Sequence, residues 1–260
     1  MVVKRITFYA NSAKSAAAAA RQHLAEVARA CGLELDDQTP EAVVVLGGDG
    51  TMLSAVHRFP GVPLLGLNLG SLGYLAAVEK PRFDAALQAL ARGAFTLSLR
   101  TALSVNGARA LNDVVVSKGV SGHAAVIELR VDGNLATRFF ADGLVIATPT
   151  GSTAYSLSAG GPILLPDSQS LVITPICPHA LTSRPLVVRE TVKLQVRLLP
   201  RPGTSTLAVF ADGADAGRLE AGEELTVVRS SESVPLVQLA GDNPFDVLNR
   251  KLGWSGSSIG

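Results

Sequence analysis

In the first third of the chain, short apolar runs alternate with segments whose apolar residues recur at helical spacing. Val2 to Tyr9 and Val62 to Leu67 predict strands, and the continuous apolar run Val43 to Leu46 is typical of a strand buried on both faces of a parallel sheet. Three segments predict helices: residues 15–30, 51–57 and 81–92. Strands that alternate with helices in this way indicate an α/β domain of the Rossmann-like kind.

From about residue 96 the helical period nearly disappears and an alternation of period two replaces it. Apolar residues alternate with charged or polar ones over Ile127 to Val131 and over Val192 to Leu198, which predicts half-buried antiparallel strands. Asn106-Gly107 and Asp132-Gly133 each separate two such runs and favour tight hairpin turns. The pattern therefore predicts an N-terminal domain over residues 1–98 and a β-rich, sandwich-like domain over residues 99–235.

Composition excludes several classes of protein. The 260 residues include 23 Lys and Arg against 22 Asp and Glu, a net charge of +1, which argues against binding nucleic acid through bulk charge. The two cysteines, Cys31 and Cys177, form no metal-spaced pair, so we expect neither a disulfide framework nor a zinc site and favour a cytoplasmic location. The uncharged segment Gly143 to Pro166 contains too many prolines and glycines for a helix in lipid, so no membrane association is expected.

The first segment with chemical interest is Gly47-Gly48-Asp49-Gly50-Thr51, which follows a predicted strand and precedes a predicted helix. Glycines allow a ligand to approach the backbone closely, and successive N–H groups at a helix N-terminus can bind phosphate oxygens. A carboxylate in such a cradle repels phosphate unless it accepts a proton or helps to hold Mg²⁺. The alternative is a structural turn in which Asp49 caps the helix, and spacing alone does not separate the two.

The second segment runs from Asp142 to Pro162 and contains many small hydroxyl residues, glycines and one tyrosine after an apolar run. This mixture offers short hydrogen-bonding groups and an aromatic face, which suits a flat polar ligand such as an adenine nucleoside. A hydroxyl-rich loop that caps a short helix is the alternative structural interpretation.

These two segments together resemble the NAD kinases, which transfer a phosphoryl group from ATP, or in some members polyphosphate, to the 2′-hydroxyl of the adenosine ribose of NAD. Other family-like segments follow in the same order, so the resemblance covers nearly the whole chain: residues 68–75, 111–115, 173–179 and 251–254. The resemblance implies ATP as donor, NAD as acceptor, Mg²⁺ or another divalent cation, and assembly as a homodimer or homotetramer. It also implies that residues 236–260 return to the N-terminal domain.

The resemblance assigns roles to individual residues. Asp49 matches the family's proton acceptor, and the residues around it, which shape the phosphate site, are Gly47, Gly48, Gly50 and Thr51. Asn112 and Asp113 match an Asn-Glu pair that binds NAD, so the acid here is one methylene shorter. The other positions that match the dinucleotide site are Tyr74, His123, Asp142, Thr150, Thr153, Ala154, Tyr155 and Ser158.

Two further departures bear on the ligand. Phe140 stands where many members have an arginine linked to preference for NAD over NADH, and Ala214 replaces a frequent glutamine after Asp212-Gly213. The use of NADH, feedback by NADP(H) and the choice between ATP and polyphosphate therefore stay open.

Two other functions also stay open: a lipid kinase of the diacylglycerol or sphingosine type, and a non-catalytic NADP(H)-binding regulator. Trp254 is expected to be a buried anchor of the C-terminal segment.

Overall fold

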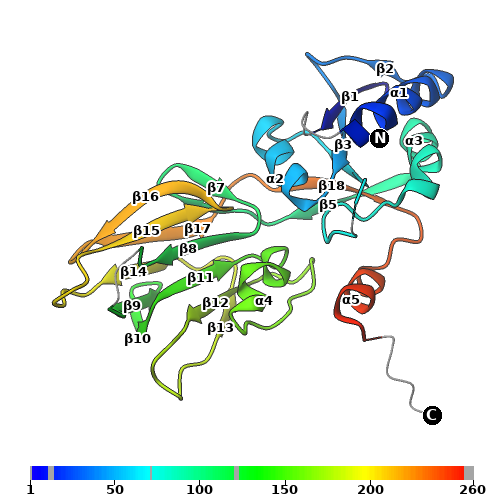
Figure 1. Cartoon of the computed structure of the whole chain (residues 1–260). Helices are drawn as coiled ribbons and strands as arrows, with labels where there is room; N and C mark the ends of the chain where they lie inside the picture. Colours follow the sequence, from blue (N-terminus) through cyan, green and yellow to red (C-terminus); the bar gives the residue numbers. More distant parts are fainter. Residues whose placement is uncertain (1, 11–14, 71, 120–122, 255–260) are drawn as a thin grey trace, which may run out of the picture. The chain divides into compact units, whose positions relative to one another are not determined.

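The structure is a computed structural model that describes residues 2–10, 15–70, 72–119 and 123–254 (Figure 1). The chain divides into two compact units. One comprises residues 1–99 together with 234–260, and the other comprises residues 100–233. The first unit is an α/β domain and the second is β-rich, which confirms the fold class predicted from the sequence.

The first unit is built on a sheet with the strand order β2-β1-β3-β4-β18-β5. Neighbouring strands from β2 to β18 run parallel. Its elements are β1 (Arg5–Ala10), α1 (Ser15–Ala30), β2 (Glu34–Leu35), β3 (Ala42–Gly47), α2 (Asp49–Arg58), β4 (Leu64–Asn68), η1 (Lys80–Arg82), α3 (Phe83–Arg92), β5 (Phe95–Arg100), β18 (Val234–Leu239) and α5 (Pro244–Leu252). All six residues of β3 are buried, as its uninterrupted apolar run predicts.

The helices of the first unit cover both faces of this sheet (Figure 1). Leu24 and Ala28 of α1 pack with Leu87 and Leu90 of α3 in one apolar cluster, together with alternate residues of β1, β3 and β4. The helix α2 buries Met52, Ala55 and Val56 outside that cluster, against the other face. The sequence pattern predicted α1 to within its observed bounds and the other two helices to within two residues.

The second unit contains two six-stranded sheets among the described residues, with the orders β10-β9-β14-β17-β6-β7 and β13-β12-β11-β8-β15-β16. Neighbouring strands are antiparallel wherever their register is defined. The strands are β6 (Leu103–Val105), β7 (Ala108–Ala110), β8 (Asp113–Ser117), β9 (Ala125–Val131), β10 (Asn134–Ala141), β11 (Gly143–Ala147), β12 (Ser170–Ile176), β13 (Leu186–Arg189), β14 (Leu194–Leu198), β15 (Thr206–Ala211), β16 (Ala214–Glu220) and β17 (Glu224–Arg229).

The inner faces of these two sheets share one apolar core. Ile127 and Leu129 of β9 belong to the same buried cluster as Val114 of β8 and Leu144 and Ile146 of β11. This packing confirms the sandwich-like arrangement. The two short helical pieces of this unit, η2 (Gly151–Thr153) and α4 (Tyr155–Ser158), follow β11, and Figure 1 shows α4 beside β11 and β12.

Hairpin turns of the second unit need a left-handed backbone. Asn106, Asp132 and Asp212 have φ angles of 48°, 50° and 48°, and each precedes a glycine that also has a positive φ. The first two turns are those predicted from their dipeptides. Asparagine and aspartate tolerate this conformation better than other non-glycine residues, which explains their place here.

The C-terminal sequence belongs to the first unit, and one expectation about it is wrong. The strand β18 adds to the parallel sheet of the first unit beside β4, which no local pattern indicated. The expectation that Trp254 is a buried anchor is wrong, because its side chain is 59% exposed. The segment docks instead through Leu248 of α5, which is buried, and through an ion pair of 2.9 Å between Arg250 and Glu79.

The uncharged segment that begins at Gly143 forms β11, η2 and α4 rather than a long helix. Across the described ranges, every helix is too short or too polar to cross a bilayer.

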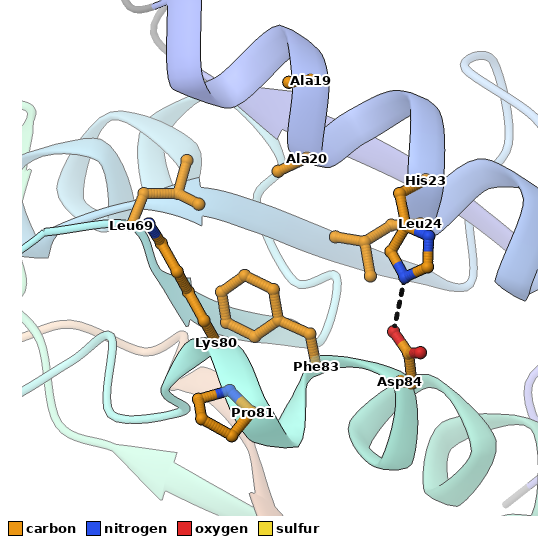
Figure 2. A pocket seen from close by; sticks show the side chains of 9 residues that line it. All are labelled: Ala19, Ala20, His23, Leu24, Leu69, Lys80, Pro81, Phe83 and Asp84. Atoms are coloured by element: carbon orange, nitrogen blue, oxygen red, sulfur yellow. Dashed lines mark hydrogen bonds and ion pairs between the residues drawn. The ribbon is translucent and has the colours of Figure 1, made fainter.

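A cavity of about 610 Å³ opens in the first unit between α1 and the η1–α3 segment. Figure 2 shows the Phe83 ring between the Lys80 side chain and the ion pair of His23 with Asp84, whose Nε2 and Oδ1 atoms are 3.0 Å apart. As far as the described residues define its wall, no residue with a role implied by the resemblance lines this cavity. It is therefore separate from the glycine-rich turn.

Candidate active site

The glycine-rich turn joins β3 directly to α2. Gly48 precedes the helix in extended conformation, and its carbonyl accepts hydrogen bonds from the N–H groups of Thr51 and Met52 at 2.9 and 3.1 Å. The N–H groups of Asp49 and Gly50 have no acceptor among the described residues, as expected for the first turn of a helix. They are available to an anion.

Close packing explains the glycine at the start of this turn. A Cβ atom at Gly47 would lie 2.3 Å from Oγ1 of Thr51, so any larger residue would displace the first turn of α2. Gly48 and Gly50 have open space at the same position. Side chains at these two positions would not clash with the protein. They would, however, stand between a ligand and the backbone N–H groups.

The carboxylate of Asp49 does not cap its own helix. Oδ2 accepts a hydrogen bond from the backbone N–H of Tyr74 at 2.8 Å, and Oδ1 accepts from Leu75 and Ala76 at 2.9 and 3.1 Å. The interpretation of Asp49 as a helix cap is therefore wrong. A carboxylate can accept about four hydrogen bonds, so the orientation of Asp49 is fixed while acceptor capacity remains for a further donor.

The loop after β4 is shaped around this carboxylate. A Cβ atom at Gly73 would lie 2.1 Å from Oδ1 of Asp49, so the contact requires glycine. The next residue, Tyr74, is half-buried, and its ring lies 5.5 Å from Nζ of Lys251 in α5. Burial first, and then the charge of Asp49, raise the pKa of the Tyr74 phenol above its ordinary value. Tyr74 is therefore neutral at physiological pH and can donate its hydroxyl proton.

In the second unit, the hydroxyl-rich segment folds back on itself. Thr148 donates from Oγ1 to the Leu111 carbonyl at 2.6 Å, Ser152 donates to the Pro149 carbonyl at 2.7 Å, and the Ser156 and Thr174 hydroxyls are 2.8 Å apart. These hydroxyls are buried and belong to the structure of the loop. These hydroxyls stabilise the loop internally, but neither η2 nor α4 receives a side-chain hydrogen bond from its N-cap residue, Thr150 or Ala154.

A different subset of the segment stays accessible. The Tyr155 side chain is 45% exposed, Ser158 is exposed, and Thr153 and Ala154 are half-buried. Thr150 is buried, and its carbonyl accepts a hydrogen bond from Thr153 Oγ1 at 3.1 Å. Of the five residues between positions 150 and 158 that the resemblance places against the dinucleotide, all except Thr150 can therefore contact a ligand with their side chains.

The structure brings Asn112 and Asp113 next to this segment. In the ladder between β8 and β11, Asp113 is the partner of Ala147, and the Asn112 carbonyl accepts a hydrogen bond from the N–H of Thr148 at 2.9 Å. The Asp113 side chain is 6% exposed. Burial, and then the charge of Asp212, raise the pKa of its carboxyl group to about 7.

Asp142 and His123 lie elsewhere in the second unit. Asp142 precedes β11 and Thr148 follows it, so the two are roughly 20 Å apart at about 3.4 Å per residue of strand. Asp142 forms an ion pair with Lys118, whose Nζ is 2.7 Å from Oδ1. His123 is exposed just before β9. The second unit thus presents the expected dinucleotide residues in two groups at opposite ends of β11.

The two departures from the family pattern occupy different surroundings. Phe140 has an aromatic neighbour in His179, with ring centroids 4.6 Å apart, and the Arg201 guanidinium lies 4.4 Å from its ring centroid. The Arg201 guanidinium therefore places a positive charge beside position 140, although Phe140 itself is uncharged. Ala214 is exposed at the start of β16, directly after the turn at Asp212.

Sequence reasoning missed Gly73 and Asp212 as parts of the site. Gly73 lies in the family-like segment 68–75, to which the resemblance assigns no role at this position, and its contact with Asp49 joins the loop after β4 to the start of α2. Asp212 accepts hydrogen bonds from the backbone N–H groups of Leu111, Asn112 and Asp113 at 2.7, 2.7 and 3.3 Å. The Asp-Gly dipeptide between two strand-like runs was the available signal, and it indicates a turn but not its partners.

Comparison with known families and structures matches both units. A model of the ATP-NAD kinase N-terminal domain matches residues 3–95, and a model of the ATP-NAD kinase C-terminal domain matches residues 111–239. The NAD kinase of Acidobacterium capsulatum is 43% identical over 232 residues, which cover 85% of this chain and 81% of that protein. The NAD kinase of Syntrophotalea carbinolica is 41% identical over 225 residues, 82% of this chain and 78% of that protein.

Solved structures agree with this result. A crystal structure of an NAD kinase from Archaeoglobus fulgidus in complex with ATP has a TM-score of 0.79 at 25% identity and covers 96% of this chain and 98% of that chain. Yeast NADH kinase complexed with NADH has the same fold, with a TM-score of 0.84 at 24% identity, over 99% of this chain and 89% of that chain. Because the family models match most of the chain and its relatives exceed 40% identity over more than four fifths of it, the chain belongs to the NAD kinase family.

Proposed function

We propose that this chain transfers the terminal phosphoryl group of ATP to the 2′-hydroxyl of the adenosine ribose of NAD and so forms NADP and ADP. The observation that carries the proposal is the arrangement around Asp49. Its carboxylate is fixed at the N-terminus of α2, beside the N–H groups of Asp49 and Gly50, in a chain that matches the family over both units. A base and a phosphate-binding backbone thus lie next to each other.

Asp49 accepts the proton of the 2′-hydroxyl as the oxygen attacks the phosphorus atom, and ADP leaves on the opposite side. The glycines of residues 47–51 hold the phosphate oxygens against the backbone. Since such a transfer depends mainly on position and charge neutralisation, the orientation of Asp49 by three backbone N–H groups favours catalysis.

In this proposal the second unit supplies most of the groups that bind the acceptor. Asn112 and Asp113 bind hydroxyl and amide groups of NAD, and Tyr155, with its exposed ring, lies against the adenine. The remaining contacts come from Tyr74, His123, Asp142, Thr150, Thr153, Ala154 and Ser158. Tyr74 comes from residues 1–98, which also carry the proposed phosphate site, and the other dinucleotide contacts come from residues 99–235.

A divalent cation fits these residues as a partner of the nucleotide. Mg²⁺ in kinases is usually held by one or two carboxylates together with substrate phosphates, and it neutralises charge on the transferred group. Within the described ranges, no three His, Cys, Asp or Glu side chains cluster as a complete metal site. The ion would therefore be held mainly by the phosphate oxygens of the nucleotide, and Asp49 keeps its role as the base.

The test is a coupled assay with purified protein, Mg²⁺, ATP and NAD, in which an NADP-specific dehydrogenase detects the product. Product should appear only when all four components are present. Replacing ATP with polyphosphate, and NAD with NADH, in parallel reactions identifies the donor and acceptor. The absence of product with every pair, together with measurable binding of NADP(H), would overturn the proposal and favour a regulator.

A lipid kinase shares the first glycine motif but finds no support in the comparisons, since both matched domain models are those of ATP-NAD kinases. Assembly as a homodimer or homotetramer stays a prediction from the resemblance, and a cytoplasmic location stays a prediction from the cysteine pattern. Light scattering of the purified protein and localisation of a tagged chain check them.

A further inference from the structure

The segment Leu111–Asp113 is held by two loops of the second unit. On one side, the Leu111 carbonyl accepts from Thr148 Oγ1 at 2.6 Å and the Asn112 carbonyl accepts from the Thr148 N–H at 2.9 Å. A Cβ atom at Gly151 would lie 1.9 Å from the Asn112 carbonyl oxygen, so this side is closely packed. The segment therefore cannot move towards the hydroxyl-rich loop.

On the other side, one carboxylate receives all the N–H groups of the segment. Asp212 accepts from Leu111 at 2.7 Å through Oδ2, and from Asn112 and Asp113 at 2.7 and 3.3 Å through Oδ1. Its own N–H donates to the Asp113 carbonyl at 3.0 Å. Hydrogen bonds from backbone N–H groups to a charged acceptor are about twice as strong as neutral ones, so these bonds dominate the position of the segment.

The turn that carries Asp212 is held in one conformation. Asp212 has a φ of 48° and Gly213 a φ of 80°, between β15 and β16. Ala211 pairs with Val114 of β8, so the base of the hairpin is registered against the strand that begins at Asp113. The carboxylate is thus presented by a rigid element and not by a free loop.

We propose that Asp212 is a positioning residue for NAD binding, which fixes the backbone of Asn112 and Asp113 so that their side chains meet the acceptor. This inference rests on the proposed function, because it needs Asn112 and Asp113 to bind NAD. It goes further because Asp212 itself touches no substrate in this account. Loss of its carboxylate should weaken NAD binding and leave ATP binding intact.

The test variant is Asp212→Asn. Asparagine tolerates the left-handed backbone, and Asn106 in this chain occupies the same kind of turn with a φ of 48°. The amide keeps one acceptor oxygen but places an NH₂ group against backbone donors, so the three hydrogen bonds cannot all form. KM for NAD should rise on the order of tenfold, with KM for ATP unchanged and kcat changed less than KM for NAD.

Asp132→Asn is the matched control. Asp132 has a φ of 50°, precedes Gly133 in a hairpin turn of the same unit, and accepts the Lys193 N–H at 2.8 Å. The same substitution there replaces a charged acceptor of a backbone N–H group with a neutral amide, far from the Asn112–Asp113 pair in sequence. KM for NAD should remain at its wild-type value in this variant.

Hydrogen exchange supplies a readout that does not depend on activity. In the wild-type protein, the N–H groups of Leu111, Asn112 and Asp113 should be protected about as well as that of Val115 within β8. In Asp212→Asn they should exchange faster, while Asp132→Asn leaves them unchanged. If Asp212→Asn does not fold, the absence of protection at these three positions in the wild-type protein still overturns the inference.

Asn112→Ala separates the inference from the proposed function. If this variant leaves KM for NAD unchanged, the Asn112–Asp113 pair does not bind NAD, and both the proposed site and the inference fail. If Asn112→Ala raises KM for NAD but a folded Asp212→Asn does not, the site stands and the role of Asp212 is contradicted.

Discussion

Gly73 lies so close to Asp49 that a Cβ atom at position 73 would be 2.1 Å from the Oδ1 atom of the carboxylate. Asp49 begins α2 directly after β3, and Gly73 lies in the loop after β4; the two strands are neighbours in the parallel sheet. Carboxyl ends of adjacent parallel strands meet at one edge of the sheet, where α/β proteins usually bind ligands. The contact therefore couples the proposed base to the loop that carries Tyr74.

Gly73→Ala should lower kcat by tenfold or more, because the added methyl group displaces the Asp49 carboxylate without removing it. We expect a lower unfolding temperature as well, since three hydrogen bonds to backbone N–H groups are disturbed. Gly70→Ala is the control, because a Cβ atom there meets no atom within 4 Å. Steady-state kinetics and thermal unfolding of both variants check this, and equal kinetics for the two would contradict it.

The affinity for NAD should depend on pH through Asp113. Burial, with the charge of Asp212 as the second cause, raises the pKa of this carboxyl group to about 7, so it is mostly protonated at pH 6 and mostly ionised at pH 8. The ionised form accepts hydrogen bonds from NAD hydroxyls at both oxygens. KM for NAD should fall by at most about tenfold from pH 6 to pH 8.

Asp113→Asn is the control for this pH dependence, because an amide does not titrate. Its KM for NAD should vary less with pH than that of the wild-type protein over the same range. A wild-type KM that stays constant, or that rises with pH, would show that ionised Asp113 does not bind the acceptor.

Stability should also respond to the ionisation of Asp113. The pKa of its carboxyl group is raised from an ordinary value of 3.8 to about 7, so between these pH values the folded state binds more protons than the unfolded state. The free energy of unfolding should therefore fall as the pH rises from about 4 to about 7. Asp113→Asn should lose this component, so that its stability relative to wild type improves with pH. Denaturant unfolding at pH 5 and pH 8 measures the difference, and a difference of opposite sign would refute the assignment.

Gly151→Ala should damage both folding and NAD binding. The Cβ atom would lie 1.9 Å from the Asn112 carbonyl oxygen and 2.3 Å from its carbonyl carbon, and this backbone group directly before β8 cannot yield as a flexible side chain can. We expect a loss of about 1–3 kcal/mol in the free energy of unfolding, as for overpacked interiors. Denaturant unfolding and KM for NAD check this, and a stable variant with unchanged KM would mean that the loop can shift.

Local sequence patterns could predict most helices and strands, because these elements depend mainly on residues that are close in the sequence. The apolar run at residues 43–46 predicted a strand buried on both faces, and the alternation at residues 194–198 predicted a half-buried one; in β9 the alternation fails at Glu128, which is buried. The place of β18 beside β4 could not be predicted this way, because about 165 residues separate the two and no motif within either strand specifies its partner.

The sequence predicted the residue types of the candidate site but not the contacts between them. The resemblance could assign a catalytic role to Asp49, but its partners Tyr74 to Ala76 depend on how two strands are ordered in the sheet. Composition identified the segment after β11 as rich in hydroxyl groups. It could not say that Thr148, Ser152 and Ser156 are used internally while Tyr155 is exposed, because that division depends on burial.

The central claim is that Asp49 is the base of an NAD kinase. The most direct test measures NADP formation under saturating ATP and NAD for Asp49→Asn, together with the dissociation constant for NAD by calorimetry. The account predicts that turnover falls by about 10²–10⁴-fold while NAD binding stays within a few fold of wild type. Near-normal turnover in a folded Asp49→Asn variant would contradict it.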